Sequence, residues 1–312
     1  MCTAILYKAI DSYFGRNLDV EHGYHECVVI TPRNYECLFR HKESSTSHYA
    51  LIGMATVIEN YPLYFDATNE KGLSMAALNF PDNACYFPYA EGKDNIAPFE
   101  IILWILGQCA TVEEAKELLK KVNLVQTNFS EEVLLSPLHW IISDKKKSIV
   151  VESIKSGLKV YDNEFDVLTN NPPFEYHKMN MNNYMDLNSG PAMNLYDQKY
   201  SFHNYSLGMG ALGLPGDYSS VSRFVRAFFV KENSLKGEDE KTNFIQFFHI
   251  LESVSMPKGC VKTKCGYEYT RYTSCCNVEK GIYHYRFYDD LKMKHVSMRD
   301  IELNDNKLYI CK

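Results

Sequence analysis

The sequence predicts an α+β protein whose sheets are antiparallel and carry helices on their outer faces. Three observations support this. The first half of the chain is mostly short β-prone segments broken by Gly, Pro and Asn; two helical segments then follow each other; and strands return on both sides of a second helical pair. A doubly wound sheet would need strands and helices to alternate one by one. No repeat or linker interrupts the order, so we expect one domain over residues 2–312.

The first strands are short runs of β-branched, aromatic or apolar residues that end at turn residues. The next segment, residues 98–109, carries a dense apolar run that favours a helix. Thr111 begins a second helix with Glu114 three residues later, the spacing of a capping box. Glu117 and Lys121 are spaced to pair on its outer face. The expected strands of this part are residues 3–9, 26–31, 50–56, 63–67 and 73–79.

The second half repeats this pattern around an irregular segment. Residues 188–217 are rich in Gly, Pro, Asn and Tyr, and so long a structureless segment in a compact domain indicates a binding or assembly loop. Helices are expected at residues 222–233 and 243–255, since Pro257 ends the second. The expected strands are residues 138–143, 148–154, 158–161 and 166–169, followed by a hairpin of residues 272–277 and 281–288.

Composition excludes several functional classes. Hydrophobic residues make up 46% of the 312 residues, which is enough for a core and argues against disorder. The net charge is −6 and no long basic run occurs, so nucleic acid is not an expected partner. The first residues lack a basic segment followed by an apolar core, and no apolar run is long enough to span or insert into a membrane. We therefore expect a cytoplasmic protein whose ten cysteines are reduced.

Three motifs resemble ligand-binding sites, but the sequence around each argues against that interpretation. Residues 208–213 match the dinucleotide pattern Gly-x-Gly-x-x-Gly, but no strand leads into them and Pro215 follows where a helix should run. His22, His25 and Glu26 lie across a loop-to-strand boundary without helical ligand spacing. The late cysteines do not form the two Cys-x-x-Cys pairs of a zinc site. No metal or cofactor site is predicted.

The start of the chain carries the strongest candidate chemistry. Removal of Met1 would leave Cys2 with a thiol and a free α-amine, so that a nucleophile and its base share one residue. Arg16 could favour the thiolate, and Asp19 could hold the α-ammonium or the thiol in position. Taken alone, a cysteine at this position is more often a small buried apolar residue.

Three further polar residues acquire meaning only as a set. Asn79 and Asn170 each end an expected strand, where asparagine ordinarily forms a turn. Arg223 falls in the first turn of an expected helix. A cation there opposes the helix dipole and needs a partner, unless the side chain simply faces solvent.

Nine short motifs occur in one order along the chain, and together they resemble the choloylglycine hydrolase family, which contains bile salt hydrolases and penicillin V acylases. The resemblance runs from residue 2 to about residue 290. The motifs are residues 1–3, 14–19, 69–73, 78–81, 138–140, 168–172, 213–217, 222–224 and 272–274.

The resemblance implies a four-layer αββα N-terminal-nucleophile fold, a homotetramer, and catalysis without cofactor or metal. It also implies residue roles. Cys2 matches the nucleophile and its freed α-amine the proton acceptor, with Arg16 and Asp19 beside them. Asn79 and Asn170 match the oxyanion hole, and Arg223 matches the arginine near the nucleophile. Residues 188–217 match the assembly loop.

The implied reaction is hydrolysis of the amide that joins a steroid acyl group to glycine or taurine. Asn79 favours bile salts, because penicillin-preferring members often carry Tyr at that position. A penicillin V acylase or another N-acyl amide hydrolase stays open, as does a non-catalytic binding protein, although the latter would be expected to lose Cys2 or the asparagine pair. The resemblance places seven apolar residues, each more often core on sequence alone, in the substrate pocket: Leu18, Val20, Ile58, Phe65, Phe129, Val133 and Leu138.

Overall fold

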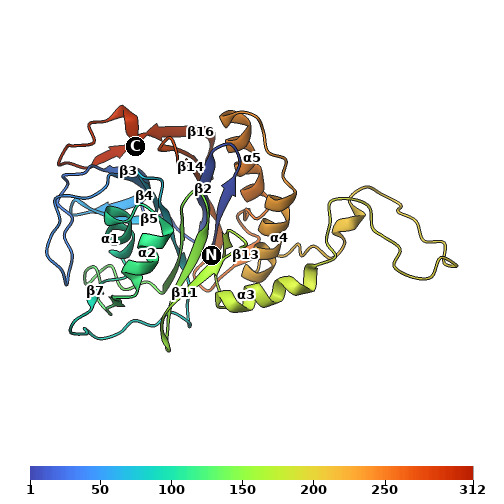
Figure 1. The fold of residues 1–312 in the computed structure, drawn as a ribbon, viewed down its shortest axis with the longest axis horizontal. Helices are drawn as coiled ribbons and strands as arrows, with labels where there is room; N and C mark the ends of the chain where they lie inside the picture. The colour runs from blue at the N-terminus through green and yellow to red at the C-terminus, as the bar shows by residue number, and fades with distance from the viewer. Residues whose placement is uncertain (312) are drawn as a thin grey trace.

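The computed structural model describes residues 1–311 and consists of four layers (Figure 1). Two antiparallel sheets face each other in the centre. Helices α1 (Ile101–Gln108) and α2 (Val112–Leu119) cover one sheet, and α4 (Ser220–Asn233) and α5 (Glu240–Glu252) cover the other. The predicted α+β class and αββα layering are therefore confirmed.

The sheet under α4 and α5 has seven strands within residues 1–311, in the order β12-β1-β2-β14-β15-β16 with β13 paired to β14. β1 and β2 run through its middle, so the start of the chain is buried in the sheet. The strands are β1 (Cys2–Lys8), β2 (Ser12–Val20), β12 (Val167–Leu168), β13 (Val261–Lys262), β14 (Tyr267–Asn277), β15 (Ile282–Phe287) and β16 (Asp290–Ser297).

The sheet under α1 and α2 has eight strands in the described chain, in the order β11-β10-β9-β6-β5-β4-β3-β17. They are β3 (Cys27–Thr31), β4 (Leu51–Ile58), β5 (Tyr61–Asn69), β6 (Ser74–Asn79), β9 (Leu138–Ser143), β10 (Ser148–Ile154), β11 (Gly157–Asn163) and β17 (Tyr309–Cys311). Outside the two sheets lie the parallel pair β7 (Asp94–Ile96) and β8 (Val122–Leu124), α3 (Phe174–Asn180), and the 3₁₀ turns η1 (Met181–Tyr184), η2 (Met209–Ala211) and η3 (Met298–Asp300).

Two hydrophobic cores separate the layers. One fills the space between the sheets and continues under α4 and α5, and the other lies under α1 and α2. β4 shows how one strand serves both: Ile52 and Met54 face the first core, whereas Leu51 and Ala55 face the second. Alternate residues of a strand point to opposite faces, so a strand between two cores is apolar on both sides.

The chief error of the sequence prediction is β2, which was not expected to be a strand. Its centre carries Gly15, Arg16, Asn17 and Asp19, residues that disfavour strands when read alone. Gly15 is required there, because a Cβ would lie 2.0 Å from the carbonyl oxygen of Ser274 on β14. The polar side chains are buried, and those of Arg16 and Asp19 belong to the site described below.

Smaller differences arise at the helices. The predicted helix 243–255 begins earlier, at Glu240, because the Asp239 carboxylate caps it by accepting from the Thr242 N–H at 2.8 Å. Glu117 pairs with Lys120 rather than with the expected Lys121. The capping residue Thr111 is confirmed, since its hydroxyl accepts from the Glu114 N–H. The short helix α3 was not predicted.

Residues 188–217 are irregular, as expected, and extend away from the layers at the right of Figure 1. The dinucleotide-like motif within them forms only η2, without a strand before it. The segment exposes large apolar side chains, among them Leu195, Tyr196, Tyr205 and Leu207. In residues 1–311 no helix combines the length and apolar character needed to cross a membrane.

Candidate active site

The structure brings the six predicted catalytic residues together around Cys2, although they come from distant parts of the chain. Hydrogen bonds or an ion-pair contact join five of them to one another, and the sixth, Arg16, interacts electrostatically with Cys2 and Asp19. The set is Cys2 on β1, Arg16 and Asp19 on β2, Asn79 at the end of β6, Asn170 after β12, and Arg223 near the start of α4.

Arg223 joins Cys2 to the rest of the group. Its buried guanidinium donates from Nη1 to the Cys2 carbonyl oxygen at 2.5 Å and to the Thr3 hydroxyl at 2.7 Å. Its Nη2 donates to Asn170 Oδ1 at 2.8 Å, and an Asp19 carboxylate oxygen lies 4.0 Å from Nη1. These partners explain how a cation is held in the first turn of a helix, where the dipole opposes it.

The start of α4 is fixed by short-range hydrogen bonds that place Arg223. Ser219 caps the helix by accepting from the Ser222 N–H, and the Ser222 hydroxyl donates to Asp217 at 2.5 Å. The Ser220 hydroxyl accepts from the Asn170 N–H at 2.8 Å. The helix is thereby docked directly onto the segment that carries Asn170.

Asp19 lies on the face of β2 that points toward the helices. Its Oδ1 accepts from the Thr270 hydroxyl at 2.6 Å, and its buried Oδ2 has no hydrogen-bond partner among the described residues. Burial raises the pKa of Asp19 above its usual range, although Arg223 and the N-terminal ammonium act in the opposite direction. The free oxygen leaves this carboxylate able to accept another hydrogen bond.

Arg16 lies on the opposite face of β2, between the two sheets. It donates from Nη1 to the carbonyl oxygens of Ala77 (2.5 Å) and Phe65 (3.0 Å), while Nη2 is buried without a partner in residues 1–311. Burial opposes its charge, but Cys2, Tyr272, Asp66 and Asp19 outweigh burial and raise the Arg16 pKa. Leu18, the residue two positions along the strand, pairs directly with Cys2. Arg16 is therefore a permanent cation on the Cys2 side of β2, and such a cation favours a thiolate.

Asn170 and Asn79 are joined to each other. Asn170 Oδ1 accepts from the Cys2 N–H at 2.7 Å, and its Nδ2 donates to the Asn79 carbonyl oxygen at 2.8 Å. The Asn79 side chain is exposed and makes no hydrogen bond with residues 1–311. Each amide group has two N–H donors, so Asn79 and Asn170 both keep at least one for a ligand.

Four of the seven predicted pocket residues lie next to this group. Leu18 pairs with Cys2, Leu138 pairs with Asn79, and the Phe65 carbonyl accepts from Arg16. Val20 is two residues beyond Leu18 and pairs with Tyr269. Leu18, Val20 and Phe65 pack on the core between the sheets.

The remaining three predicted pocket residues pack on the other core, under α1 and α2. The Phe129 ring contacts Tyr61, with ring centroids 5.5 Å apart, and Tyr61 pairs with Ile58 at the end of the β4–β5 hairpin. Val133 lies in the loop after Phe129. The structure thus divides the predicted pocket residues between two places, and their contact with substrate stays a prediction.

Sequence reasoning missed several residues that support the site. The Thr3 hydroxyl accepts a hydrogen bond from Arg223, and the Thr270 hydroxyl donates one to Asp19. The buried Asp66 carboxylate accepts from the hydroxyls of Tyr272 (2.7 Å) and Tyr283 (2.6 Å). Nothing in a single sequence distinguishes these from ordinary strand residues, because their partners lie far away along the chain.

Met1 is present in the structure and precedes Cys2, so the Cys2 nitrogen is a peptide N–H. The Met1 ammonium donates to the Asp19 carbonyl oxygen at 2.5 Å and to Glu268 Oε1 at 2.7 Å. Cys2 itself is buried, with 2% of its surface exposed. An α-amine at Cys2 therefore requires removal of Met1.

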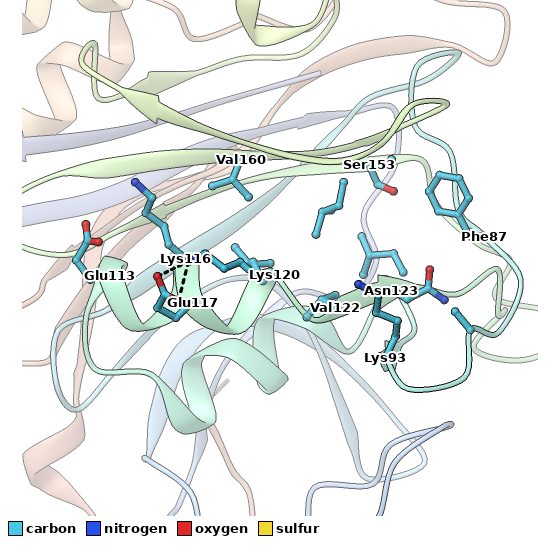
Figure 2. Close-up of a pocket in the computed structure, with 15 residues that line it drawn as sticks. Phe87, Lys93, Glu113, Lys116, Glu117, Lys120, Val122, Asn123, Ser153 and Val160 are labelled. Atoms are coloured by element: carbon cyan, nitrogen blue, oxygen red, sulfur yellow. Dashed lines mark hydrogen bonds and ion pairs between the residues drawn. The ribbon is translucent and has the colours of Figure 1, made fainter.

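Two hollows on the described surface lie apart from this group. Figure 2 shows the larger one, about 820 Å³ in volume, between α2 and the β10–β11 edge. Apolar residues such as Val122 and Val160 line it together with Lys116 and Lys120, and Lys120 is ion-paired with Glu117. Neither hollow is lined by any of the thirteen predicted catalytic or pocket residues.

An αββα fold with a cysteine at the head of a central strand defines the class of N-terminal-nucleophile hydrolases. Within that class the chain belongs to the choloylglycine hydrolase family of linear amide C–N hydrolases, whose family model matches residues 2–311. It is accordingly an enzyme of amide hydrolysis.

Similar proteins cover almost the whole chain. A bile salt hydrolase/transferase from Lactiplantibacillus plantarum is 52% identical over 99% of this chain and 95% of its own. A conjugated bile acid hydrolase from Lactobacillus gasseri is 42% identical over 99% of both chains.

Solved structures agree on the fold. The mutant C2A conjugated bile acid hydrolase from Clostridium perfringens superposes with a TM-score of 0.92 at 38% identity, covering 100% of this chain and 97% of its own. A penicillin V acylase from Agrobacterium tumefaciens has a TM-score of 0.78 at 21% identity, covering 98% and 90%, and shares the fold.

Proposed function

We propose that this enzyme hydrolyses the amide bond of bile salts conjugated to glycine or taurine, through a thioester on Cys2. The observation that carries the proposal is the hydrogen-bonded group that joins Cys2 to Arg223, Asn170 and Asn79, in a chain 52% identical to a bile salt hydrolase. The relatives named above support the substrate class.

The first requirement is removal of Met1. The Cys2 nitrogen then becomes an α-amine that can accept a proton near neutral pH. Asn170 Oδ1, which accepts from this nitrogen at 2.7 Å, keeps it oriented. Asp19, with one carboxylate oxygen free, is available to the α-ammonium that forms.

Attack by the Cys2 sulfur on the substrate carbonyl creates a negative charge on oxygen. The Cys2 α-amine takes the proton of the thiol, and the positive charge of Arg16 lies on the same side of β2 as Cys2. The free N–H donors of Asn79 and Asn170 receive the oxyanion. A neutral amide suits this role because it binds the developing charge without attracting an anionic ground state equally strongly. The Cys2 α-ammonium returns its proton to the departing amino acid, and water then hydrolyses the thioester.

Penicillin V cleavage is the alternative within this family. The likeness to a penicillin V acylase rests on fold alone at 21% identity, and Asn79 stands where we expect Tyr in penicillin-preferring enzymes. The exposed apolar residues of the 188–217 segment support assembly through that loop into a homotetramer. The cytoplasmic location stays a prediction from the sequence.

The function is tested by measuring glycine and taurine release from glycocholate and taurocholate, beside penicillin V cleavage, on protein whose intact mass is known. We expect bile salt turnover only from chains that lack Met1. Cleavage of penicillin V without bile salt turnover would overturn the substrate, and turnover of neither by a chain lacking Met1 would overturn the proposed function.

A further inference from the structure

We propose that the buried His139 is a positioning residue for the hydrolysis. It holds the segments that carry Asn79 and Asn170 at the separation at which both side-chain amides bind one oxyanion. This inference deepens the proposed function and rests on it, because the oxyanion role of the two asparagines is part of that function. His139 takes no part in the chemical steps and acts through the asparagines.

The two asparagines belong to different sheets, so their separation depends on how the sheets are held together at this point. Asn79 ends β6 of the eight-stranded sheet, whereas Asn170 follows β12, the strand of the seven-stranded sheet that pairs with β1. Donors that converge on one developing charge must be placed to within about 0.5 Å. A contact that crosses between the sheets beside these residues therefore affects the reaction.

His139 makes a contact of this kind with the segment of Asn170. It lies on β9, and Ile141, two residues further along, packs on the core between the sheets, so His139 faces the same space. Its Nε2 donates to the Thr169 carbonyl oxygen at 2.8 Å. Thr169 immediately precedes Asn170, so this hydrogen bond ties the Asn170 segment to the eight-stranded sheet.

The same ring packs against the segment of Asn79. Phe80, which follows Asn79, stacks on His139 with ring centroids 4.2 Å apart and ring planes inclined by 5°. Both rings are fully buried, and Leu78 lies opposite His139 in the pairing of β6 with β9. His139 therefore contacts the chain neighbour of each asparagine, Phe80 on one side and Thr169 on the other.

Glu152 fixes the orientation of the His139 ring. Its Oε1 lies 3.2 Å from His139 Nδ1 and also accepts from the Phe174 N–H at 3.0 Å, at the start of α3. Neither side chain of this pair has any exposed surface. One ring nitrogen faces a carboxylate and the other a carbonyl oxygen, so only one orientation of the ring satisfies both. A phenylalanine at this position would keep the stacking and lose both polar contacts.

The test compares two reactions of Cys2 that differ in their need for oxyanion donors. Glycocholate hydrolysis passes through a tetrahedral oxyanion, whereas in alkylation by iodoacetamide the sulfur displaces iodide at a saturated carbon and no oxyanion forms. His139→Phe removes the donor, and His139→Gln restores one. His284→Phe is the matched control, because His284 is also buried and stacks on Phe244, at 4.3 Å, but lies on β15.

The measurements use chains that lack Met1, with the fold of each variant checked by circular dichroism. We expect His139→Phe to lower kcat/KM for glycocholate by about 10–100-fold, the effect of displaced oxyanion donors. The rate constant for inactivation by iodoacetamide should stay within about twofold, since it depends on the thiolate and its accessibility. It is also independent of how much protein is folded.

The two other variants separate the hydrogen bond from the bulk of the ring. His139→Gln should keep kcat/KM within about fivefold of the unmodified chain, because its amide donates to the Thr169 carbonyl in place of Nε2. His284→Phe should change neither the hydrolysis nor the inactivation, although it also replaces a buried imidazole by a phenyl ring.

Three results would overturn the inference and leave the proposed function intact. An unchanged kcat/KM in His139→Phe would show that the asparagines do not depend on this ring. An equal fall in hydrolysis and in alkylation would show that His139 supports Cys2 rather than the oxyanion donors. A folded His139→Gln chain outside the expected range would exclude the hydrogen bond to Thr169 as the cause. If the unmodified chain lacks Met1 and still releases no glycine from glycocholate, the proposed function fails, and this inference fails with it.

Discussion

At the scale of single residues, Asn79 and Asn170 share the proposed role of oxyanion donor but lie in different environments. Asn170 is buried and has hydrogen bonds to Cys2, Asn79 and Arg223, whereas the Asn79 side chain is exposed and free of partners in the described chain. A substitution at Asn79 therefore isolates the oxyanion interaction, and a substitution at Asn170 does not.

We expect Asn79→Ala to lower kcat by about 10²–10³, the effect of removing one oxyanion donor, and to leave the melting temperature nearly unchanged. Asn170→Ala should lower kcat and also destabilise the fold, because buried partners lose their hydrogen bonds. Steady-state kinetics and thermal unfolding of the two variants test this. A large drop in the Asn79→Ala melting temperature, or unchanged kcat, would contradict the assigned role.

Residue identities were easier to predict than residue contacts. The six candidates were found from motifs, and the need of Arg223 for a partner followed from the helix dipole. Its actual partners, the Cys2 and Asn170 groups, lie more than fifty positions away along the chain. His139 lies in one of the nine motifs, but a single sequence does not show that its ring contacts the segments of both asparagines.

The element scale shows why helices were predicted better than the central strand. The expected helices rested on apolar periodicity and caps, which are local properties. β2 owes its conformation to pairing with β1 and β14, and its polar residues are tolerated because distant groups satisfy them. A strand that carries a buried active site breaks the usual strand pattern, so local propensity fails at the place where the chemistry lies.

His177 on α3 is expected to make the stability of the folded chain depend on pH. His177 is buried, stacks on Phe224 at 4.7 Å, and donates from Nε2 to the Asn170 carbonyl oxygen at 2.9 Å. Burial lowers the pKa of His177 to about 4, below the value of 6.5 in an unfolded chain. Stability from the neutral ring is thus complete above pH 6.5 and is lost as pH falls toward 4.

We expect the free energy of unfolding to decrease between about pH 6.5 and pH 4, and to do so less steeply in His177→Gln. His284, whose pKa burial lowers to about 4, should contribute in the same sense. Denaturant unfolding at several pH values measures the slopes. An identical slope in the variant would show that His177 is not linked to folding in this way.

At the scale of the whole molecule, the 188–217 segment stands out because a single folded chain does not bury its large apolar side chains. It leaves the four layers and exposes Leu207, Tyr205 and Leu195 at 101%, 79% and 77%. Side chains of this size favour burial against another surface, here proposed to be further copies of the chain.

Replacing Tyr205 and Leu207 by serine should shift the protein toward smaller assemblies while each chain keeps its fold. Light scattering after size-exclusion chromatography measures the mass, and circular dichroism checks the fold. A substitution of two exposed residues on the hollow of Figure 2, Lys93→Ser and Glu113→Ser, serves as the control. A monomeric unmodified chain, or an unchanged mass in the variant, would contradict assembly through this loop.

The central claim is that Cys2, freed from Met1, is the nucleophile. The measurement that tests it most directly is the intact mass of the protein after it has been mixed with a conjugated bile salt and the reaction has been rapidly quenched. We expect one acyl group on chains that lack Met1, sensitive to hydroxylamine as a thioester is, and none on Cys2→Ala. An acyl group or turnover in Cys2→Ala, or full activity in chains that retain Met1, would contradict the claim.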